Sequence, residues 1–201
     1  MRGALPLLAV VLFAAGCGGS TARVVETPPP AKKVFAGAAL SPPHRAPPLS
    51  LRDASGRRFT LKAQRGRYVL VTFIYTHCPD VCPLITSNLN TVLRTLGPKG
   101  NVEVLAVSVD PKGDTPAAVR AYEKSKHLEP AFHYLIGTRA ELRPVWVAWN
   151  VIAVDRKPDL VDHAAYTALI DPSGQERLLY GSQVNAQQVL HDLRLLKKQG
   201  A

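Results

Sequence analysis

Residues 68–83, YVLVTFIYTHCPDVCP, decide the fold of this chain. Residues 68–75 are β-branched or aromatic almost throughout, which predicts a short strand buried on both faces. After residue 83, apolar side chains recur at helical spacing as far as residue 96, where Gly97-Pro98 ends the pattern. We therefore predict a buried strand, a loop carrying Cys78 and Cys82, and a helix over residues 83–96 with Pro83 at its first position.

The same alternation of strands and helices continues along the chain. Strands are predicted over residues 49–53, 58–61, 102–109, 132–136, 167–171 and 175–180, and helices over residues 116–126, 139–149 and 185–198. The first two of these strands form a hairpin that turns at Gly56, and the last two form one that turns at 171–174. This order predicts an α/β fold, a thioredoxin-like mixed sheet flanked by helices, with an extra N-terminal β-hairpin.

The N-terminus has the features of a secretion signal. Arg2 precedes an apolar run of about a dozen residues, which is too short to cross a bilayer core of about 30 Å. The small residues before Cys17 resemble a bacterial lipoprotein cleavage site, which implies that residues 1–16 are removed and that Cys17 carries acyl chains. An ordinary signal peptide with an incidental cysteine is the alternative. We expect a membrane-anchored lipoprotein of the bacterial cell envelope, facing the periplasm or the outer side of the cytoplasmic membrane.

Two further segments follow the signal. Residues 17–46 are rich in proline and alanine, which favours extended conformations and predicts a semi-rigid tether. Residues 47–198 hold the predicted strands and helices and form the domain.

The charge of the chain is strongly basic but scattered. There are 25 Lys and Arg against 15 Asp and Glu, a formal net charge of +10. No basic block is interleaved with aromatic residues, as a base-stacking surface requires. We therefore expect no nucleic-acid partner, and interpret the charge as a solvated surface near anionic lipid or an acidic partner.

Cys78 and Cys82 follow a buried strand and precede a helix, a position where α/β sheets bind ligands. The positive end of the helix favours thiolates, which serve as nucleophiles, redox centres or soft metal ligands. A structural disulfide is a weak alternative, because it would close a loop of only three intervening residues. A structural zinc site needs four ligands, and only two cysteines remain once Cys17 is assigned to lipid.

The choice between redox and metal chemistry depends on His163. Dithiol enzymes of the thioredoxin type separate their cysteines by two residues and place a cis-proline before the strand that passes the dithiol. This chain has three intervening residues, and no proline lies between Pro158 and Pro172. His163 precedes the strand predicted at residues 167–171, so an imidazole there would face the two sulfurs. The combination favours a metal site.

The other histidines are given lesser roles. In an extended chain His77 would project away from Cys78, so we interpret it as a spectator or a support for the ligands. We expect the remaining four to be solvent-facing or satisfied by hydrogen bonds: His44, His127, His133 and His191.

Three ordered motifs resemble those of the Sco/SenC family of copper chaperones. They are YTHCPDVCP from residue 75, VSVDPKGDTP from residue 107 and VDHAAYTALIDPSG from residue 161. The resemblance implies a thioredoxin-like fold and one copper ion bound by Cys78, Cys82 and His163. It also implies supporting roles at four further family positions: Asp80, Asp110, Pro111 and Asp162.

The function expected from the resemblance is a copper metallochaperone for the dinuclear copper site of a respiratory cytochrome c oxidase. Its partners would be the oxidase's copper-binding subunit and an upstream copper donor. Soft thiolates favour Cu(I), and Cu(II) is left open as a second state. We expect no turnover of a small substrate. The alternative is a thiol-disulfide oxidoreductase that reduces the oxidase's copper-binding cysteines. A peroxidase is disfavoured, because its threonine lies three residues before the reactive cysteine and Thr76 lies two before Cys78.

Overall fold

β4 (Tyr68–Ile74) is the central strand of the domain, and each of its side chains is buried. The computed structural model describes residues 34–151, 154–157, 160–162 and 165–200, and no side chain between residues 152 and 164. These residues belong to one structural unit, Lys33–Ala201.

The main sheet has eight strands in the order β1-β10-β9-β4-β5-β6-β2-β3. β4, β5 and β6 are parallel, and the other neighbouring pairs are antiparallel, so the sheet is mixed as predicted. The remaining strands of this sheet are β1 (Ala38–Arg45), β2 (Ser50–Asp53), β3 (Arg58–Thr60), β5 (Val102–Ser108), β6 (Phe132–Ile136), β9 (Thr167–Ile170) and β10 (Gln175–Tyr180). β7 (Val154–Lys157) and β8 (Leu160–Asp162) form a separate hairpin that the sequence pattern did not predict.

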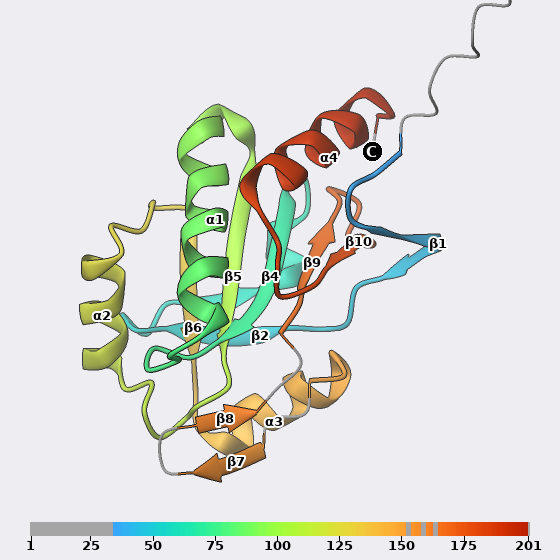
Figure 1. Ribbon diagram of the computed structural model, residues 1–201. Coiled ribbons are helices and arrows are strands. Elements are labelled where there is room, and N and C mark those ends of the chain that lie inside the picture. Colours follow the sequence, from blue (N-terminus) through green and yellow to red (C-terminus); the bar gives the residue numbers. More distant parts are fainter. Residues whose placement is uncertain (1–33, 152–153, 158–159, 163–164, 201) are drawn as a thin grey trace, which may run out of the picture. The chain divides into compact units, whose positions relative to one another are not determined.

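Helices flank the sheet, which confirms the predicted fold class. They are α1 (Val81–Leu96), α2 (Pro116–Ser125), α3 (Arg139–Ala148) and α4 (Ala186–Lys198), with short 3-10 turns η1 (Leu61–Gln64) and η2 (Pro98–Gly100). α1 and α4 lie side by side over the central strands, while α2 lies beside β6 (Figure 1). Among the described residues, no helix combines the length and apolarity needed to cross a bilayer.

The predicted helix boundaries hold to within one residue except at the start of α1. This helix begins at Val81, two residues before the predicted start, so Pro83 occupies its third position. The first N–H groups of a helix have no partner within the helix, and proline is therefore tolerated throughout the first turn.

The sheet also takes in part of the predicted tether. Residues 38–45 form β1, which pairs with β10 at both of its ends and has irregular register between Ala39 and His44. Pro42 and Pro43 lie in that irregular stretch. Proline donates no backbone hydrogen bond, which an edge strand such as β1 tolerates.

The start of the domain is held by a buried acid on α4. Asp192 accepts hydrogen bonds from the N–H groups of Ala36 at 2.8 Å and Gly37 at 2.9 Å, and from the Tyr180 hydroxyl at 2.9 Å. The Tyr180 ring lies where a side chain at Gly37 would extend, so glycine is needed for this close approach. The segment that leads into β1 is thereby fixed against α4.

Candidate metal-binding site

Cys78 and Cys82 lie on a turn between the end of β4 and the first turn of α1. The Cys78 N–H donates to the Tyr75 carbonyl at 3.3 Å, which closes a turn over Thr76 and His77. Cys82 is completely buried in the core, whereas Cys78 is partly exposed. Both are free thiols. Solvent therefore reaches the pair from the side of Cys78.

The two thiols interact through a hydrogen bond that shifts their pKa values in opposite directions. A hydrogen bond from the Cys82 thiol is the largest influence on Cys78 and lowers its pKa to about 6 against the opposing effect of burial. Donation from the N–H groups of Asp80 and Cys82 and from the Tyr75 hydroxyl lowers it further. The same hydrogen bond, together with burial, raises the pKa of Cys82 well above its ordinary value. The hydrogen bond between the two thiols therefore favours the thiolate form at Cys78 and the thiol form at Cys82.

Asp114 holds the loop that carries the two cysteines by hydrogen bonds to Thr76. Its Oδ1 accepts from the Thr76 N–H at 2.9 Å and the Thr76 hydroxyl at 2.7 Å. Its Oδ2 accepts from the Ser108 hydroxyl at 2.6 Å and the Tyr134 hydroxyl at 3.0 Å. Burial raises the pKa of Asp114, and these hydrogen bonds oppose that shift. One buried carboxylate thus ties the cysteine loop to β5 and β6.

Sequence reasoning missed Asp114. The residue lies within VSVDPKGDTP, from which only Asp110 and Pro111 were selected. Asp110 closes its own turn, accepting from the N–H groups of Lys112 at 3.1 Å and Gly113 at 3.0 Å. Nothing in the local pattern distinguishes the two acids, because the partners of Asp114 come from two separate strands, β5 and β6, and from the cysteine loop.

The structure describes some of the predicted site residues and not others. Cys78 and Cys82 are brought together as expected. Asp80 is exposed at the N-cap of α1 and makes no side-chain capping bond. His163 and Cys17, together with the side chain of Asp162, lie outside the residues that the structure describes.

Close to His163 in sequence, Tyr166 is held against β4. Its carbonyl accepts from the Thr72 hydroxyl at 3.2 Å, and its ring packs on Phe73 with centroids 5.5 Å apart. Thr72 lies opposite Thr167 in the antiparallel pairing of β4 and β9. The chain therefore enters β9 from the end of β4 that carries the cysteines.

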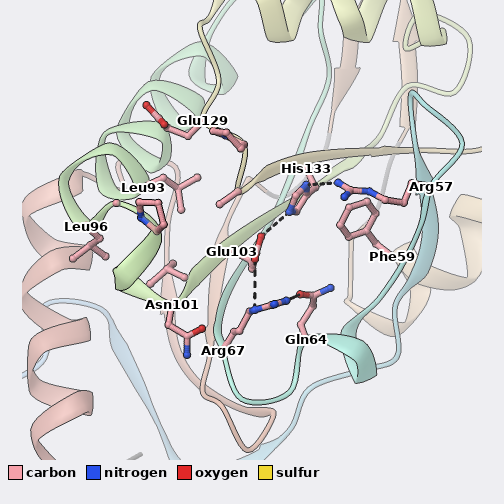
Figure 2. Close-up of a pocket in the computed structure, with 15 residues that line it drawn as sticks. Arg57, Phe59, Gln64, Arg67, Leu93, Leu96, Asn101, Glu103, Glu129 and His133 are labelled. Carbon is pink, nitrogen blue, oxygen red and sulfur yellow. Dashed lines mark hydrogen bonds and ion pairs between the residues drawn. The ribbon is translucent and has the colours of Figure 1, made fainter.

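A second polar cluster lies at the opposite end of the parallel strands, in a cavity of about 590 Å³ (Figure 2). His133 Nε2 lies 2.6 Å from Glu103, and its Nδ1 lies 3.4 Å from the Arg57 guanidinium. Because a guanidinium only donates, Nδ1 accepts and Nε2–H donates to the carboxylate. This agrees with the expected role of His133 as a satisfied histidine.

The other three histidines expected to be satisfied or solvent-facing are all exposed. His44 pairs with Glu176 at 3.1 Å, His191 lies 3.3 Å from the Val34 carbonyl, and His127 lies beyond the end of α2.

The cysteine pair provides soft ligands on a partly open surface. Two sulfurs, of which Cys78 has a lowered pKa, suit a monovalent soft ion that accepts low coordination. Among the described residues, no group of three or more His, Cys, Asp or Glu is placed to hold a metal ion. Any third ligand therefore has to come from another part of the chain or from a partner.

Comparisons with known proteins place this geometry in context. A profile of the SCO1/SenC family matches residues 38–198. Mitochondrial SCO2 of Saccharomyces cerevisiae is 32% identical over 155 residues, which cover 73% of this chain and 51% of the yeast protein. The chain thus spans about half the length of that relative.

Solved structures agree with the profile. Bradyrhizobium japonicum ScoI with copper bound superposes with a TM-score of 0.65 at 32% identity, covering 75% of this chain and 98% of ScoI. Apo Sco1 of Thermus thermophilus superposes with a TM-score of 0.70 at 32% identity, and the match covers 83% of this chain and 99% of the Thermus chain.

Proposed function

The chain belongs to the SCO1/SenC family, and on this premise we propose that it is a copper metallochaperone. It binds one copper ion through Cys78, Cys82 and His163 and delivers it to the dinuclear copper site of a respiratory cytochrome c oxidase. The family takes part in copper assembly of that oxidase. The partners are then the oxidase's copper-binding subunit and an upstream donor.

The observation that carries the proposal is the pair of free thiols between β4 and α1, of which Cys82 is completely buried and Cys78 is partly exposed. The Cys82 hydrogen bond lowers the pKa of Cys78 to about 6, which favours a thiolate that can bind an incoming Cu(I) ion at the partly exposed side of the pair. Cys82 then binds the ion as its proton passes to water. Two sulfurs and one imidazole leave Cu(I) with low coordination, so that an acceptor's ligands can displace them stepwise. This is the property that a donor of metal needs.

His163 is supported as third ligand by the path of the neighbouring chain. Ala165 and Tyr166 lead into β9 from the cysteine end of β4, since Thr167 pairs with Thr72. His163 lies two residues before Ala165 in the sequence. This position in the sequence, two residues before a segment that leads from the cysteine end of β4, supports His163 as the third ligand.

We expect the reduced protein to take up one equivalent of Cu(I) under anaerobic titration, and His163→Ala to weaken that binding by about a hundredfold. Loss of one of three ligands accounts for this change, since about 2.7 kcal/mol corresponds to a hundredfold. The matched control is His127→Asn, which removes an exposed histidine and suits the left-handed backbone there. Wild-type affinity in His163→Ala would contradict the assigned ligand set.

A second function, reduction of the oxidase's cysteines, is favoured by the same thiolate. Cys78 attacks a partner's disulfide, and Cys82 then displaces the partner's thiol while the chain becomes a disulfide. This exchange needs both cysteines but no imidazole. His163→Ala therefore separates the two functions, because a reductase keeps its exchange rate in that variant and a chaperone loses its copper.

We also propose that Cys17 carries acyl chains and holds the domain at the bacterial cell envelope, facing the periplasm or the outer side of the cytoplasmic membrane. The apolar run and the small residues before Cys17 support this. In a bacterium fed labelled palmitate, the wild-type chain is expected to carry label and sediment with membranes, and Cys17→Ala to lose the label. Equal labelling of both chains would show that Cys17 is not the acylated residue.

A further inference from the structure

The fold gathers basic residues that are scattered along the sequence at the end of the sheet opposite the cysteines. Lys197 on α4 donates to the Gly100 carbonyl at 2.8 Å, just before β5 begins. Asn101 donates to the Gly66 carbonyl at 2.6 Å, and the Gly66 N–H donates to the Pro172 carbonyl at 2.9 Å. The end of α4, η2, the segment before β4 and the turn between β9 and β10 therefore meet where the parallel strands begin.

The exposed charges at this end of the domain are basic. The acids nearby are covered and paired, because Asp171 is buried against Arg177 and Glu103 is partly buried against His133. The exposed basic residues come from β1, the segment before β4, η2 and α4, and together we call them the basic end: Arg45, Lys62, Arg65, Arg67, Lys99, Lys197 and Lys198.

The exposed acids lie elsewhere. Among the residues whose side chains the structure describes, only Asp80 and Glu141 are exposed acids. They lie at the starts of α1 and α3, which follow the carboxyl ends of β4 and β6. The cysteine end of the sheet thus carries exposed charges of both signs, and the basic end carries exposed charges of one sign.

A cavity of about 570 Å³ lies within the basic end. Among the described residues that line it, the charged ones are Arg45, Lys62 and Arg65. Within the described part of the chain, none of these three charged groups forms a hydrogen bond or an ion pair. The Arg65 guanidinium occupies the space that a side chain at Gly174 would take. Three like charges around one cavity repel each other, so an anion between them is stabilising.

We infer that the basic end binds the phosphate groups of anionic phospholipids, with Arg45, Lys62 and Arg65 holding a headgroup in the cavity. Guanidinium and ammonium groups donate charge-assisted hydrogen bonds to phosphate oxygens. A membrane surface presents many such phosphates, which suits cations spread over several segments. This interaction is independent of copper binding.

The path of the chain supports a membrane as the partner. The Val34 carbonyl, where the described chain begins, lies 3.3 Å from Nε2 of His191 on α4, and Figure 1 shows this segment beside the end of that helix. Cys17, the proposed site of acylation, precedes Val34 in the sequence by a segment that spans at most about 60 Å. An acylated Cys17 therefore keeps the basic end within reach of the lipid headgroups.

Contact at the basic end turns the cysteines away from the membrane. β4 runs from Tyr68 at the basic end to Ile74, shortly before the cysteine loop. A strand rises about 3.3 Å per residue, so the loop lies about 20 Å farther from the headgroups than the start of β4. Cys78 then stays accessible to a partner while the domain rests on the lipid.

We expect the full chain with Cys17→Ala to bind vesicles of one part phosphatidylglycerol to two parts phosphatidylcholine more tightly than vesicles of phosphatidylcholine alone. Combining Arg45→Gln, Lys62→Gln and Arg65→Gln with Cys17→Ala should weaken binding to the anionic vesicles about a hundredfold, because each basic side chain near such a surface contributes about fivefold. Cosedimentation measures both. The apolar run at the N-terminus is present in every chain and does not distinguish the variants.

The matched control removes three charges outside the basic end. Lys112→Gln, Lys124→Gln and Arg143→Gln change exposed residues on the loop after β5, on α2 and on α3. At physiological ionic strength, charges more than about 8 Å from the lipid are screened, so this variant should bind within about threefold of its parent. Equal losses in the two triple variants would overturn the inference.

Three further outcomes would also overturn it. Equal binding of the parent chain to both kinds of vesicle would show that charge does not hold the domain. Release from anionic vesicles by millimolar inorganic phosphate would assign the cavity to the free ion, and binding to polyglutamate but not to vesicles would assign the surface to an acidic protein. Alkylation of Cys78 by iodoacetamide should proceed at one rate with and without anionic vesicles, and protection would contradict the orientation. Anaerobic copper titration tests the proposed function separately, so either proposal can fail alone.

Discussion

Cys82→Ala is expected to lower the affinity for Cu(I) by about a thousandfold or more, the largest effect of any single change in this chain. It removes one of two soft ligands and leaves only one sulfur for the ion. The variant should fold, because alanine is a smaller apolar residue at a fully buried position. Anaerobic competition titration measures the affinity, and circular dichroism verifies the fold.

The same variant should also change the reactivity of the remaining thiol. The Cys82 hydrogen bond is the largest cause of the lowered pKa of Cys78, about 6. In the reduced, metal-free wild type, alkylation of Cys78 by iodoacetamide should rise with pH through that value and then level off, since the thiolate is the nucleophile. In Cys82→Ala the midpoint should move to higher pH.

The reciprocal variant provides the control. Cys78→Ala should lose copper binding to a similar degree, while Cys82 stays almost unreactive towards iodoacetamide because its side chain is completely buried. An alkylation midpoint for Cys78 that is the same in Cys82→Ala as in the wild type would contradict the role of the Cys82 hydrogen bond in lowering the pKa of Cys78. Tight Cu(I) binding in Cys82→Ala would show that the ion is held elsewhere.

Asp114→Ala is expected to lower the free energy of unfolding by about 3 to 5 kcal/mol and to weaken copper binding together with it. The change leaves three hydroxyls and one backbone N–H without their acceptor in the protein interior, each of which carries a desolvation cost. The released Thr76 no longer fixes the cysteine loop. Chemical denaturation of the metal-free protein measures the stability.

Asp114→Asn separates the role of the charge from that of the shape. Its amide oxygen still accepts from Thr76, and its NH₂ group faces the Ser108 and Tyr134 hydroxyls, which rotate to accept. We therefore expect a smaller loss, about 1 to 2 kcal/mol. If Asp114→Ala were as stable as wild type, the network would not anchor the loop.

Much of the fold follows from local pattern. The run 68–75 is apolar enough to specify a strand buried on both faces, and Gly97 with Pro98 ends α1 where expected. Thr115, Thr138 and Asn185 cap the helices that follow, each by accepting from a backbone N–H of the first turn. These signals are local, so they can be recognised from a single sequence.

The misses have a different origin. β1 lies among prolines and becomes a strand only because β10 supplies its partner. Asp114 resembles any acid before a Thr-Pro helix start, and its importance comes from donors on β5, β6 and the cysteine loop.

By itself, the sequence determined the chemistry available to this protein: two thiols separated by three residues at the start of a helix, within an alternation of strands and helices that specifies the sheet. Only the tertiary structure decided how that chemistry is distributed. The hydrogen bond between the buried Cys82 and the partly exposed Cys78, together with burial, lowers the pKa of Cys78 and raises that of Cys82. The hydrogen bonds of Asp114 tie the cysteine loop to β5 and β6. Both outcomes depend on desolvation and on donors from distant strands, and neither is a property of the local residue pattern.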